Sequence, residues 1–262
     1  MGDYGLIQGA LDDTAVLATY AQTKTWRPAV AQFFDEFFRG HAVGTFVDIG
    51  ANIGLTTIPI ARNSGISCFS FEPVPDHFRF LRNNVQANCP RRNVQLFELA
   101  LFDSVGNFDF RRSDRNKGDH HLSPDGSDAA PSENEAPVIR VPTARLDDVL
   151  SPYLADGAGP LAAKIVAQGA ETQIVVGGQR VLSGAGAMLI EIYPYGIQRL
   201  QGDLPRLLRF CSLHFTRGVL NTGEHDEVLT WVPVDDIATQ LRDRYEAATR
   251  VPGEYYHLFL KK

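Results

Sequence analysis

Short apolar runs that end at an acidic residue or a turn recur along the chain, and the most informative one lies in residues 45–60. It reads TFVDIGANIGLTTIPI, an apolar run closed by Asp48, a turn with two glycines, and a run whose apolar positions suit a helix. A second apolar run, residues 67–71, is followed by Glu72. We therefore expect a strand, a loop and a helix, followed by a second strand that ends in an acid.

The rest of the chain continues this alternation. Helices are expected over residues 75–88, 168–182 and 204–210, and strands over residues 93–99, 161–166, 188–192, 213–216 and 255–260. Such alternation predicts a doubly wound α/β fold, with a mostly parallel Rossmann-like sheet and helices on both faces. A ligand should bind at the carboxyl ends of the strands, near the point where the strand order switches.

Residues 1–42 precede the first strand, and their apolar positions suit two amphipathic helices. Two interpretations are open. The segment covers the ligand pocket as a helical cap on the domain formed by residues 43–262, from which Tyr20 and Trp26 could reach a substrate. Alternatively, its phenylalanines simply pack on the sheet as core, which we favour for Phe33, Phe34, Phe37 and Phe38.

Residues 112–137 are polar, rich in Asp, Ser, Pro and Gly, and nearly free of large apolar side chains. A structureless stretch of this length is usually functional or disordered, so we expect a lid inserted between two strands of a β-arm, residues 106–110 and 138–141. Its obvious chemical groups are His120 and His121. Near pH 7 a neutral imidazole can accept a proton from a hydroxyl. The alternative is two solvated loop histidines, and no metal-ligand spacing accompanies them.

The turn after the first strand indicates the chemistry of the ligand. Its pattern is D-x-G-x-N-x-G, formed by Asp48, Gly50, Asn52 and Gly54. Glycine lacks a Cβ and tolerates positive φ, so the backbone can approach a ligand closely. A dinucleotide site would carry G-x-G-x-x-G to hold a diphosphate. An ordinary strand-to-helix turn stays open, but the pattern favours a cationic ligand without phosphate, such as S-adenosylmethionine.

Glu72 strengthens this interpretation. It lies roughly 20 residues beyond the glycine turn, where a carboxylate can accept two hydrogen bonds from ribose hydroxyls. A solvated acid at a strand end is the alternative. Strand, glycine turn, helix, strand and terminal acid in this order are much rarer by chance than any one part. The order therefore favours a nucleoside cofactor.

The composition of the chain limits which classes of protein and partner remain. With 262 residues, 44% hydrophobic and 21% charged, the chain reads as one soluble globular α/β domain with additions. A formal net charge of -6 argues against a nucleic-acid partner and favours a small-molecule or glycan acceptor. Three widely spaced cysteines indicate neither a disulfide framework nor a zinc site. No signal-peptide pattern or membrane-length apolar run is present, so we expect a cytoplasmic protein, with an oligomer possible.

The motifs resemble those of the FkbM-type S-adenosylmethionine-dependent methyltransferases, which carry VDVGANIG, then FEP, then an L-x-x-N helix. This chain has VDIGANIG at residues 47–54, FEP at residues 71–73 and LRNN at residues 81–84. Further matches bring the resemblance to about residues 43–193; they lie at residues 100–106, 145–150, 164–165, 169–171 and 189–191.

The resemblance implies a seven-stranded sheet with an antiparallel last strand, and S-adenosylmethionine as cofactor. The adenine would lie at Ala100, and Asp48 would support the amino-acid end. The full set of residues expected to bind the cofactor is Asp48, Gly50, Ala51, Asn52, Gly54, Glu72 and Ala100.

One departure concerns catalysis. The family usually shows KIDxEGAE or KIDTQGAE after its fourth strand, whereas this chain reads KIVAQGAE, with Val166 in place of the acid. An alcohol is a poor nucleophile until its proton moves to an acceptor, and valine cannot accept one. The candidates for this base are Glu171, Glu191, His120 and His121. We rank His121 and Glu171 first.

Substrate contacts are expected from the same edge of the sheet. We assign them to His120, Lys164 and Glu191. For Lys164 a structural alternative stays open, an ion pair with Glu171 that shapes the floor of the pocket.

The first functional hypothesis is an O-methyltransferase acting on a hydroxyl of a sugar or polyketide-like metabolite, the substrate class that the resemblance implies. The second is a degenerate methyltransferase that binds the cofactor as a sensor or scaffold, suggested by Val166. A nicotinamide-dependent enzyme is disfavoured by the absence of G-x-G-x-x-G.

Overall fold

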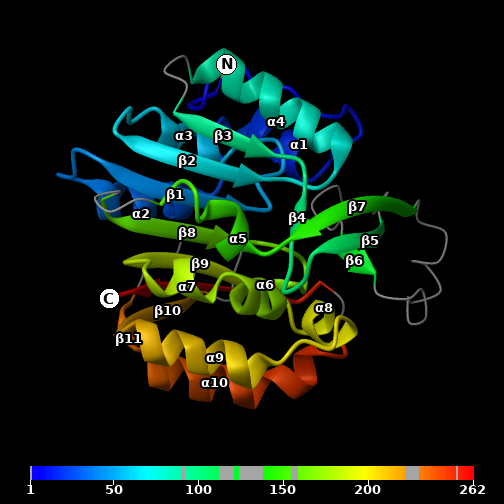
Figure 1. The fold of residues 1–262 in the computed structure, drawn as a ribbon, viewed down its shortest axis with the longest axis vertical. Coiled ribbons are helices and arrows are strands. Elements are labelled where there is room, and N and C mark those ends of the chain that lie inside the picture. The colour runs from blue at the N-terminus through cyan, green and yellow to red at the C-terminus, as the bar shows by residue number, and fades with distance from the viewer. Residues whose placement is uncertain are drawn as a thin grey trace.

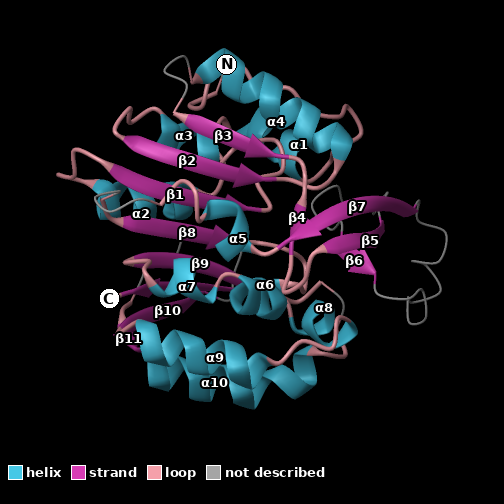
Figure 2. Ribbon diagram, in the orientation of Figure 1, coloured by secondary structure: helices cyan, strands magenta, loops and turns pink. Residues whose placement is uncertain are grey.

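The computed structural model describes residues 2–89, 93–111, 121–123, 138–154, 159–221, 230–251 and 253–262, of which residues 111 and 121–123 are described for their backbone alone. Within these residues the main sheet has eight strands in the order β11-β10-β12-β9-β8-β1-β2-β3 (Figures 1 and 2). Their bounds are β1 Gly44–Ile49, β2 Ile66–Phe71, β3 Val94–Phe97, β8 Leu161–Ile165, β9 Ala187–Ile192, β10 Arg217–Asn221, β11 Val232–Pro233 and β12 Tyr256–Lys261.

The strand directions confirm the expected doubly wound α/β fold. Strands β3, β2, β1, β8 and β9 pair in parallel, and β12 lies antiparallel between β9 and β10. The two-residue strand β11 adds an eighth strand at the edge to the seven expected. The strand order switches at β1, between β2 and β8, so the carboxyl end of β1 is where such a sheet opens a crevice for a ligand.

Helices cover both faces of the sheet because successive side chains along each strand point to opposite sides. Phe46 of β1 joins one apolar core with Phe34 and Ile58, while its neighbour Val47 joins the other with Leu146 and Ile174. The helices of the first face are α1 Val16–Thr23, α2 Pro28–Phe38, α3 Thr57–Ala61 and α4 Pro75–Asn88. The helices of the second face are α5 Leu146–Leu150, α6 Glu171–Gly177, α7 Gln179–Ser183, α8 Pro194–Arg199, α9 Leu204–His214 and α10 Val234–Ala248.

A second sheet stands beside the carboxyl edge of the first. The arrowheads of β1, β2 and β3 point toward it in Figure 2. Its order is β4-β7-β5-β6, with bounds β4 Ala100–Leu101, β5 Gly106–Arg111, β6 His121–Ser123 and β7 Val138–Ala144. The antiparallel pair β5 and β7 is the β-arm that the sequence predicts. The lid expected at residues 112–137 lies outside the described residues, except for β6.

Two local predictions are wrong in detail. The helix expected over residues 168–182 begins at Glu171 and breaks after Gly177. It begins late because Gln168 and Gly169 have positive φ values of 53° and 108°, which a right-handed helix excludes. The helix breaks after Gly177, which lies close to the backbone of Phe102. A Cβ added at Gly177 would lie 2.1 Å from the carbonyl oxygen of Phe102.

The strand expected over residues 213–216 is the end of α9, which continues to His214. The apolar residue Leu213 is 69% exposed, so it marks the outer side of a helix and not a buried strand. The strand begins at Arg217 instead.

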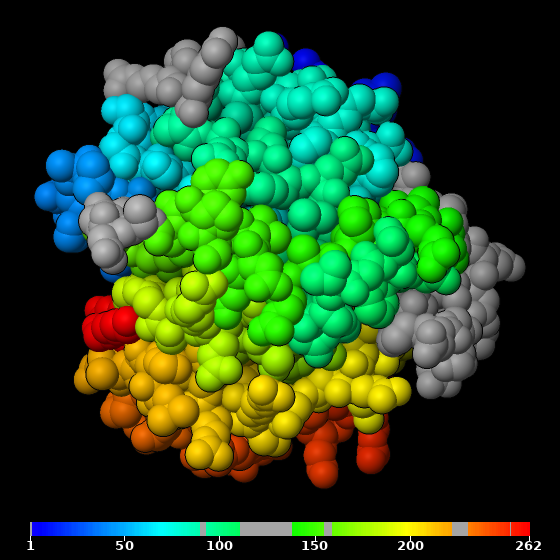
Figure 3. Space-filling model, in the orientation of Figure 1, coloured from blue at the N-terminus to red at the C-terminus, as the bar shows by residue number. Residues whose placement is uncertain are grey.

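The strands follow one another along the long axis of the molecule, from β3 near α4 to β11 near α9 (Figure 1). In the space-filling view, the surface runs from cyan residues of α4 at the top to yellow and orange residues of α9 and α10 at the bottom (Figure 3). None of the helices in the described ranges is long and apolar enough to cross a membrane.

Candidate functional site

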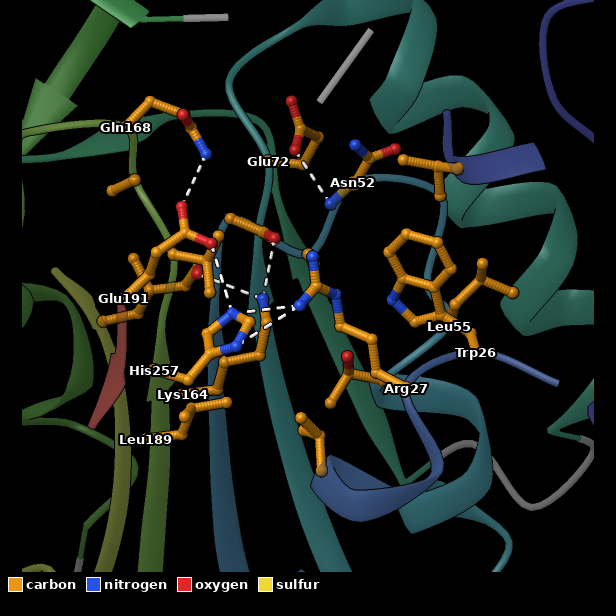
Figure 4. A pocket seen from close by; sticks show the side chains of 18 of the residues that line it. Trp26, Arg27, Asn52, Leu55, Glu72, Lys164, Gln168, Leu189, Glu191 and His257 are labelled. Atoms are coloured by element: carbon orange, nitrogen blue, oxygen red, sulfur yellow. Dashed lines mark hydrogen bonds and ion pairs between the residues drawn. The ribbon is translucent and has the colours of Figure 1, made fainter. Parts of the chain in front are cut away.

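A cavity of about 620 Å³ opens at the carboxyl edge of the main sheet. Its walls come from the ends of β1, β2, β8, β9 and β12, and from the start of α2 (Figure 4). The cavity therefore lies where the switch in strand order predicts a ligand site.

The end of β1 is held by a buried ion pair. Lys164 Nζ donates to Asp48 Oδ1 at 2.8 Å and to the carbonyl oxygen of Gly50 at 2.9 Å. A second donor, Thr57 Oγ1, lies 2.7 Å from Asp48 Oδ2. Asp48 is fully buried and does not line the cavity. Through Lys164 it supports the glycine turn from inside the protein. Lys164 pairs with Asp48 and not with Glu171, which corrects that alternative.

Gly50 is required by the protein itself. Its φ is 75°, and an added Cβ would lie 1.9 Å from the carbonyl oxygen of Val166. The sequence argument attributed this glycine to the approach of a ligand. In the structure the close approach is between the two backbone segments that leave β1 and β8. Gly54 is also left-handed, with a φ of 95°.

Glu72 lies at the end of β2 and orders the turn from the other side. Its two carboxylate oxygens accept hydrogen bonds from the backbone nitrogens of Asn52 and Val74, each at 2.9 Å. Burial raises the pKa of Glu72 from 4.5 to about 7, against these hydrogen bonds, which lower it. In the described residues, the buried Oδ1 atom of Asn52 has no hydrogen-bond partner. Ala51 and Ala100 line the cavity beside them.

The opposite wall carries a histidine–carboxylate pair. His257 of β12 and Glu191 of β9 are partners in the antiparallel register, and their Nε2 and Oε2 atoms lie 3.3 Å apart. Gln168 Nε2 donates to the other oxygen, Glu191 Oε1, at 2.8 Å. Burial alone would raise the pKa of Glu191, but its hydrogen bond with His257 and the nearby positive charges, including those of Arg27 and Lys164, outweigh burial and lower the pKa. Glu191 is therefore held as an anion.

Arg27 is the residue before α2, and its side chain extends to this wall. Its NH1 atom lies 3.2 Å from Nε2 and 3.3 Å from Nδ1 of His257, and its NH2 atom donates to the hydroxyl of Tyr255 at 3.1 Å. The guanidinium also lies 5.4 Å from the ring centre of Trp26 and 5.6 Å from that of Tyr255.

The structure brings most of the expected residues together. Ala51, Asn52, Glu72 and Ala100 line the cavity, as do Gly50, Lys164 and Glu191. Gly54 lies in the same turn but does not line the cavity; its nearest side-chain neighbours are Leu81 and Ile58.

Of the two residues ranked first as the base, Glu171 does not line the cavity, and the side chain of His121 is not described. The carboxylate of Glu171 is fully buried and accepts hydrogen bonds from the backbone nitrogens of Ala167 and Gly169 at 2.9 and 3.0 Å. Burial raises the pKa of Glu171 to about 7. This carboxylate orders the loop after β8. The backbone of His121 lies in β6, and the side chain of His121 and all of His120 fall outside what the structure describes.

Sequence reasoning missed Arg27, Gln168 and His257. The signal for Gln168 was present, because it sits in the KIVAQGAE motif after the fourth strand. His257 lies among apolar residues on the last strand. Its contact with Glu191 depends on the register between β12 and β9, which no local sequence pattern reveals. Arg27 comes from the segment before the first strand, in which aromatic residues dominated the pattern.

The comparison with family models identifies a methyltransferase family. A family model described as the methyltransferase FkbM domain matches residues 48–233. No match is found among curated proteins.

Three similar solved structures are methyltransferases or their domains. The precorrin-6y C5,15-methyltransferase from Geobacter metallireducens GS-15 has 14% identity over 100% of both chains and a TM-score of 0.45. The METTL16 methyltransferase domain has 10% identity over 99% of this chain and 74% of its own, with a TM-score of 0.48. The plantazolicin methyltransferase BpumL, in complex with SAH, has 8% identity over 94% and 88%, with a TM-score of 0.43.

Proposed function

The chain belongs to the FkbM methyltransferase family, and we propose that it uses S-adenosylmethionine to methylate a hydroxyl of a small sugar or polyketide-like metabolite. The observation that carries this proposal is a single cavity of about 620 Å³ lined by the glycine turn, Glu72 and the His257–Glu191 pair. The proposed cofactor site and the proposed proton acceptor thus line the same cavity, whose size is typical for small-molecule sites.

The residues on the turn side fit the cofactor. Each oxygen of the Glu72 carboxylate accepts one backbone hydrogen bond and keeps a lone pair for a ribose hydroxyl. The orphaned Oδ1 atom of Asn52 needs a donor, which the ammonium group of the cofactor's amino acid would provide. The apolar surface around Ala100, with Leu99 and Leu101, suits an adenine ring.

The residues on the opposite wall suit deprotonation of an alcohol. The bound cofactor supplies a methyl group on a positively charged sulfur, so the acceptor oxygen must lose its proton as it attacks. We assign the proton to Nδ1 of His257, because Nε2 faces the Glu191 carboxylate at 3.3 Å. The buried anion of Glu191 orients the imidazole and stabilises the imidazolium that forms. This pair supplies a proton acceptor in a site where Val166 replaces the expected acid.

Aromatic side chains support the class of acceptor. Trp26, Tyr193 and Tyr255 line the cavity around the histidine. Aromatic rings with a polar tip combine a flat apolar surface with a hydrogen-bonding group, which suits a sugar or a polyketide-like ring that presents several oxygens.

The test is transfer of a tritiated methyl group from S-adenosylmethionine to a panel of sugars and polyketide-like alcohols, with amines and thiols beside them. We expect label in hydroxyl acceptors. His257→Gln keeps a donor for Glu191 but is a far poorer base, so turnover should fall about 100-fold or more while the protein still binds S-adenosylhomocysteine. The matched control is His214→Gln, at the end of α9 against Phe210 and away from the cavity.

Three results would count against the proposal. Label confined to amines or thiols would contradict O-methylation. Full turnover of His257→Gln would contradict the assigned base. Binding of S-adenosylhomocysteine by a wild-type protein that methylates nothing would favour the second hypothesis, a cofactor-binding module without transfer, which Val166 also suggests.

A further inference from the structure

Arg27 is a cation on the cavity wall whose hydrogen-bond partners in the described residues are not carboxylates, although its charge helps to lower the pKa of Glu191. Its partners in the described part of the chain are the rings of Trp26 and Tyr255, the Tyr255 hydroxyl and the imidazole of His257. A guanidinium carries five N–H donors, and two of its nitrogens, NH1 and NH2, make these hydrogen bonds. Donors therefore remain for an anionic ligand.

The backbone also singles out this residue. Arg27 has a φ of 41° and a ψ of 65°, a left-handed conformation that a residue with a Cβ adopts at a cost. Such conformations cluster at functional sites, where the surrounding structure maintains them. The rings of Trp26 and Tyr255 pack near the guanidinium and keep it at the cavity wall.

The other long cation on the cavity wall is already satisfied. Lys164 Nζ has three acceptors, namely Asp48 Oδ1 at 2.8 Å and the carbonyl oxygens of Gly50 at 2.9 Å and Ile49 at 3.4 Å. An ammonium group has three donors, so Lys164 has none left for a ligand.

The amides of the glycine turn are also largely used. The backbone nitrogens of Gly50 and Ala51 both donate to the carbonyl oxygen of Phe71, at 3.1 and 2.9 Å. Asn52 N donates to Glu72 Oε2, and Gly54 N donates to the carbonyl oxygen of Ala51. These four backbone donors are therefore already used inside the protein and are not open to an anion.

We propose that Arg27 binds the carboxylate of the methionine moiety of S-adenosylmethionine. This inference rests on the proposed function, because it assumes that cofactor. In the proposed function Glu72 binds the ribose and Asn52 the ammonium, and Arg27 is a cation on the same cavity wall with donors to spare for the carboxylate. The family match begins at residue 48, so this contact comes from a segment that the family motifs do not include.

Two consequences follow from the position of Arg27. The segment with α1 and α2 becomes a functional part of the cofactor site, which gives the proposed helical cap of residues 1–42 a specific role. In addition, a guanidinium that turns toward a carboxylate releases Nδ1 of His257, the atom assigned to receive the proton. Cofactor binding would thereby prepare the base.

The experiment compares two nucleosides by calorimetric titration, without any methyl acceptor. S-adenosylhomocysteine has the amino-acid end, whereas 5′-methylthioadenosine has the same nucleoside and a thioether but neither carboxylate nor ammonium. A guanidinium has no hydrogen-bond acceptor, so it can distinguish the two ligands through the carboxylate and not through the ammonium.

We expect Arg27→Met to weaken binding of S-adenosylhomocysteine by about 10- to 100-fold, the range for a charge-assisted hydrogen bond, and to leave 5′-methylthioadenosine within about twofold. The affinity of Arg27→Lys for S-adenosylhomocysteine should lie between those of Arg27→Met and the unchanged protein, because lysine keeps the charge but lacks the planar guanidinium. The matched control is Arg79→Met, which removes an exposed arginine lying 5.3 Å from the ring of Phe80 on α4. It should change neither affinity.

The remaining outcomes overturn the inference in distinguishable ways. An unchanged affinity of Arg27→Met for S-adenosylhomocysteine means that the carboxylate binds elsewhere or that Arg27 serves a carboxylate of the acceptor. Equal losses for both nucleosides mean that Arg27 acts through the structure of the cavity. If the wild-type protein binds neither nucleoside, the proposed function fails together with this inference.

Discussion

Substitution of Gly50 by alanine tests whether the turn after β1 is shaped by the protein or by its ligand. The added Cβ would lie 1.9 Å from the carbonyl oxygen of Val166, whereas ordinary contact begins at 3.4 Å, so the two segments would have to separate by 3.4 − 1.9 = 1.5 Å. Hydrogen bonds oppose this movement. Val166 N donates to Ile49 O at 3.1 Å, and Lys164 Nζ donates to Gly50 O at 2.9 Å.

The expected cost has two parts. A left-handed alanine costs about 1–2 kcal/mol. Separation of the segments breaks one or two buried hydrogen bonds, at about 1–3 kcal/mol each. We therefore expect Gly50→Ala to lower the free energy of unfolding by about 2–8 kcal/mol in urea titrations without ligand, a large share of the ~5–15 kcal/mol of a typical domain.

Gly40→Ala is the matched control, because Gly40 has a φ of 83° and nothing lies within 4 Å of its added Cβ. It should cost the conformational part alone. Equal losses for Gly50→Ala and Gly40→Ala would refute the contact between the two segments. A stable Gly50→Ala protein that fails only to bind S-adenosylhomocysteine would show instead that the ligand requires this glycine.

Three further outcomes are expected. Burial raises the pKa values of Glu72 and Glu171 from 4.5 to about 7, so the folded chain binds these protons more tightly than the unfolded chain. The protonated forms of these two groups therefore stabilise the fold by about 3 kcal/mol each. This contribution is complete below about pH 4.5 and is lost as the pH rises through 7. Equal urea midpoints at pH 5 and pH 8 would contradict this prediction. Lys164→Met leaves the buried Asp48 without its cation and should cost about 3–5 kcal/mol in the same assay, whereas addition of Asp48→Asn should recover part of the loss. Glu72→Ala removes the proposed ribose contacts and should weaken S-adenosylhomocysteine binding by at least about 10-fold; an unchanged dissociation constant would mean that the ribose lies elsewhere.

Local patterns in the sequence were sufficient for the unit from β1 to β2. The apolar runs of β1 and β2, the glycine turn and the terminal acid Glu72 are features of neighbouring residues, and α4 has the bounds expected from its periodicity. The alternation of strands and helices was sufficient for the doubly wound sheet, because parallel strands need crossovers of one hand. Breaks set by packing, such as the one after Gly177, were not visible in the periodicity.

The wall opposite the turn depended on the tertiary structure. Arg27 and His257 are 230 residues apart in the sequence and meet because α2 packs under the same sheet in which β12 inserts between β9 and β10. The partner of Lys164 was decided in the same way, since β8 lies beside β1 and places its ammonium against Asp48. A one-residue change of register would turn the strand side chains His257 and Lys164 to the other face of the sheet. The sequence therefore determined which chemical groups the sheet edge carries, whereas strand pairing and helix packing decided which of them face one another.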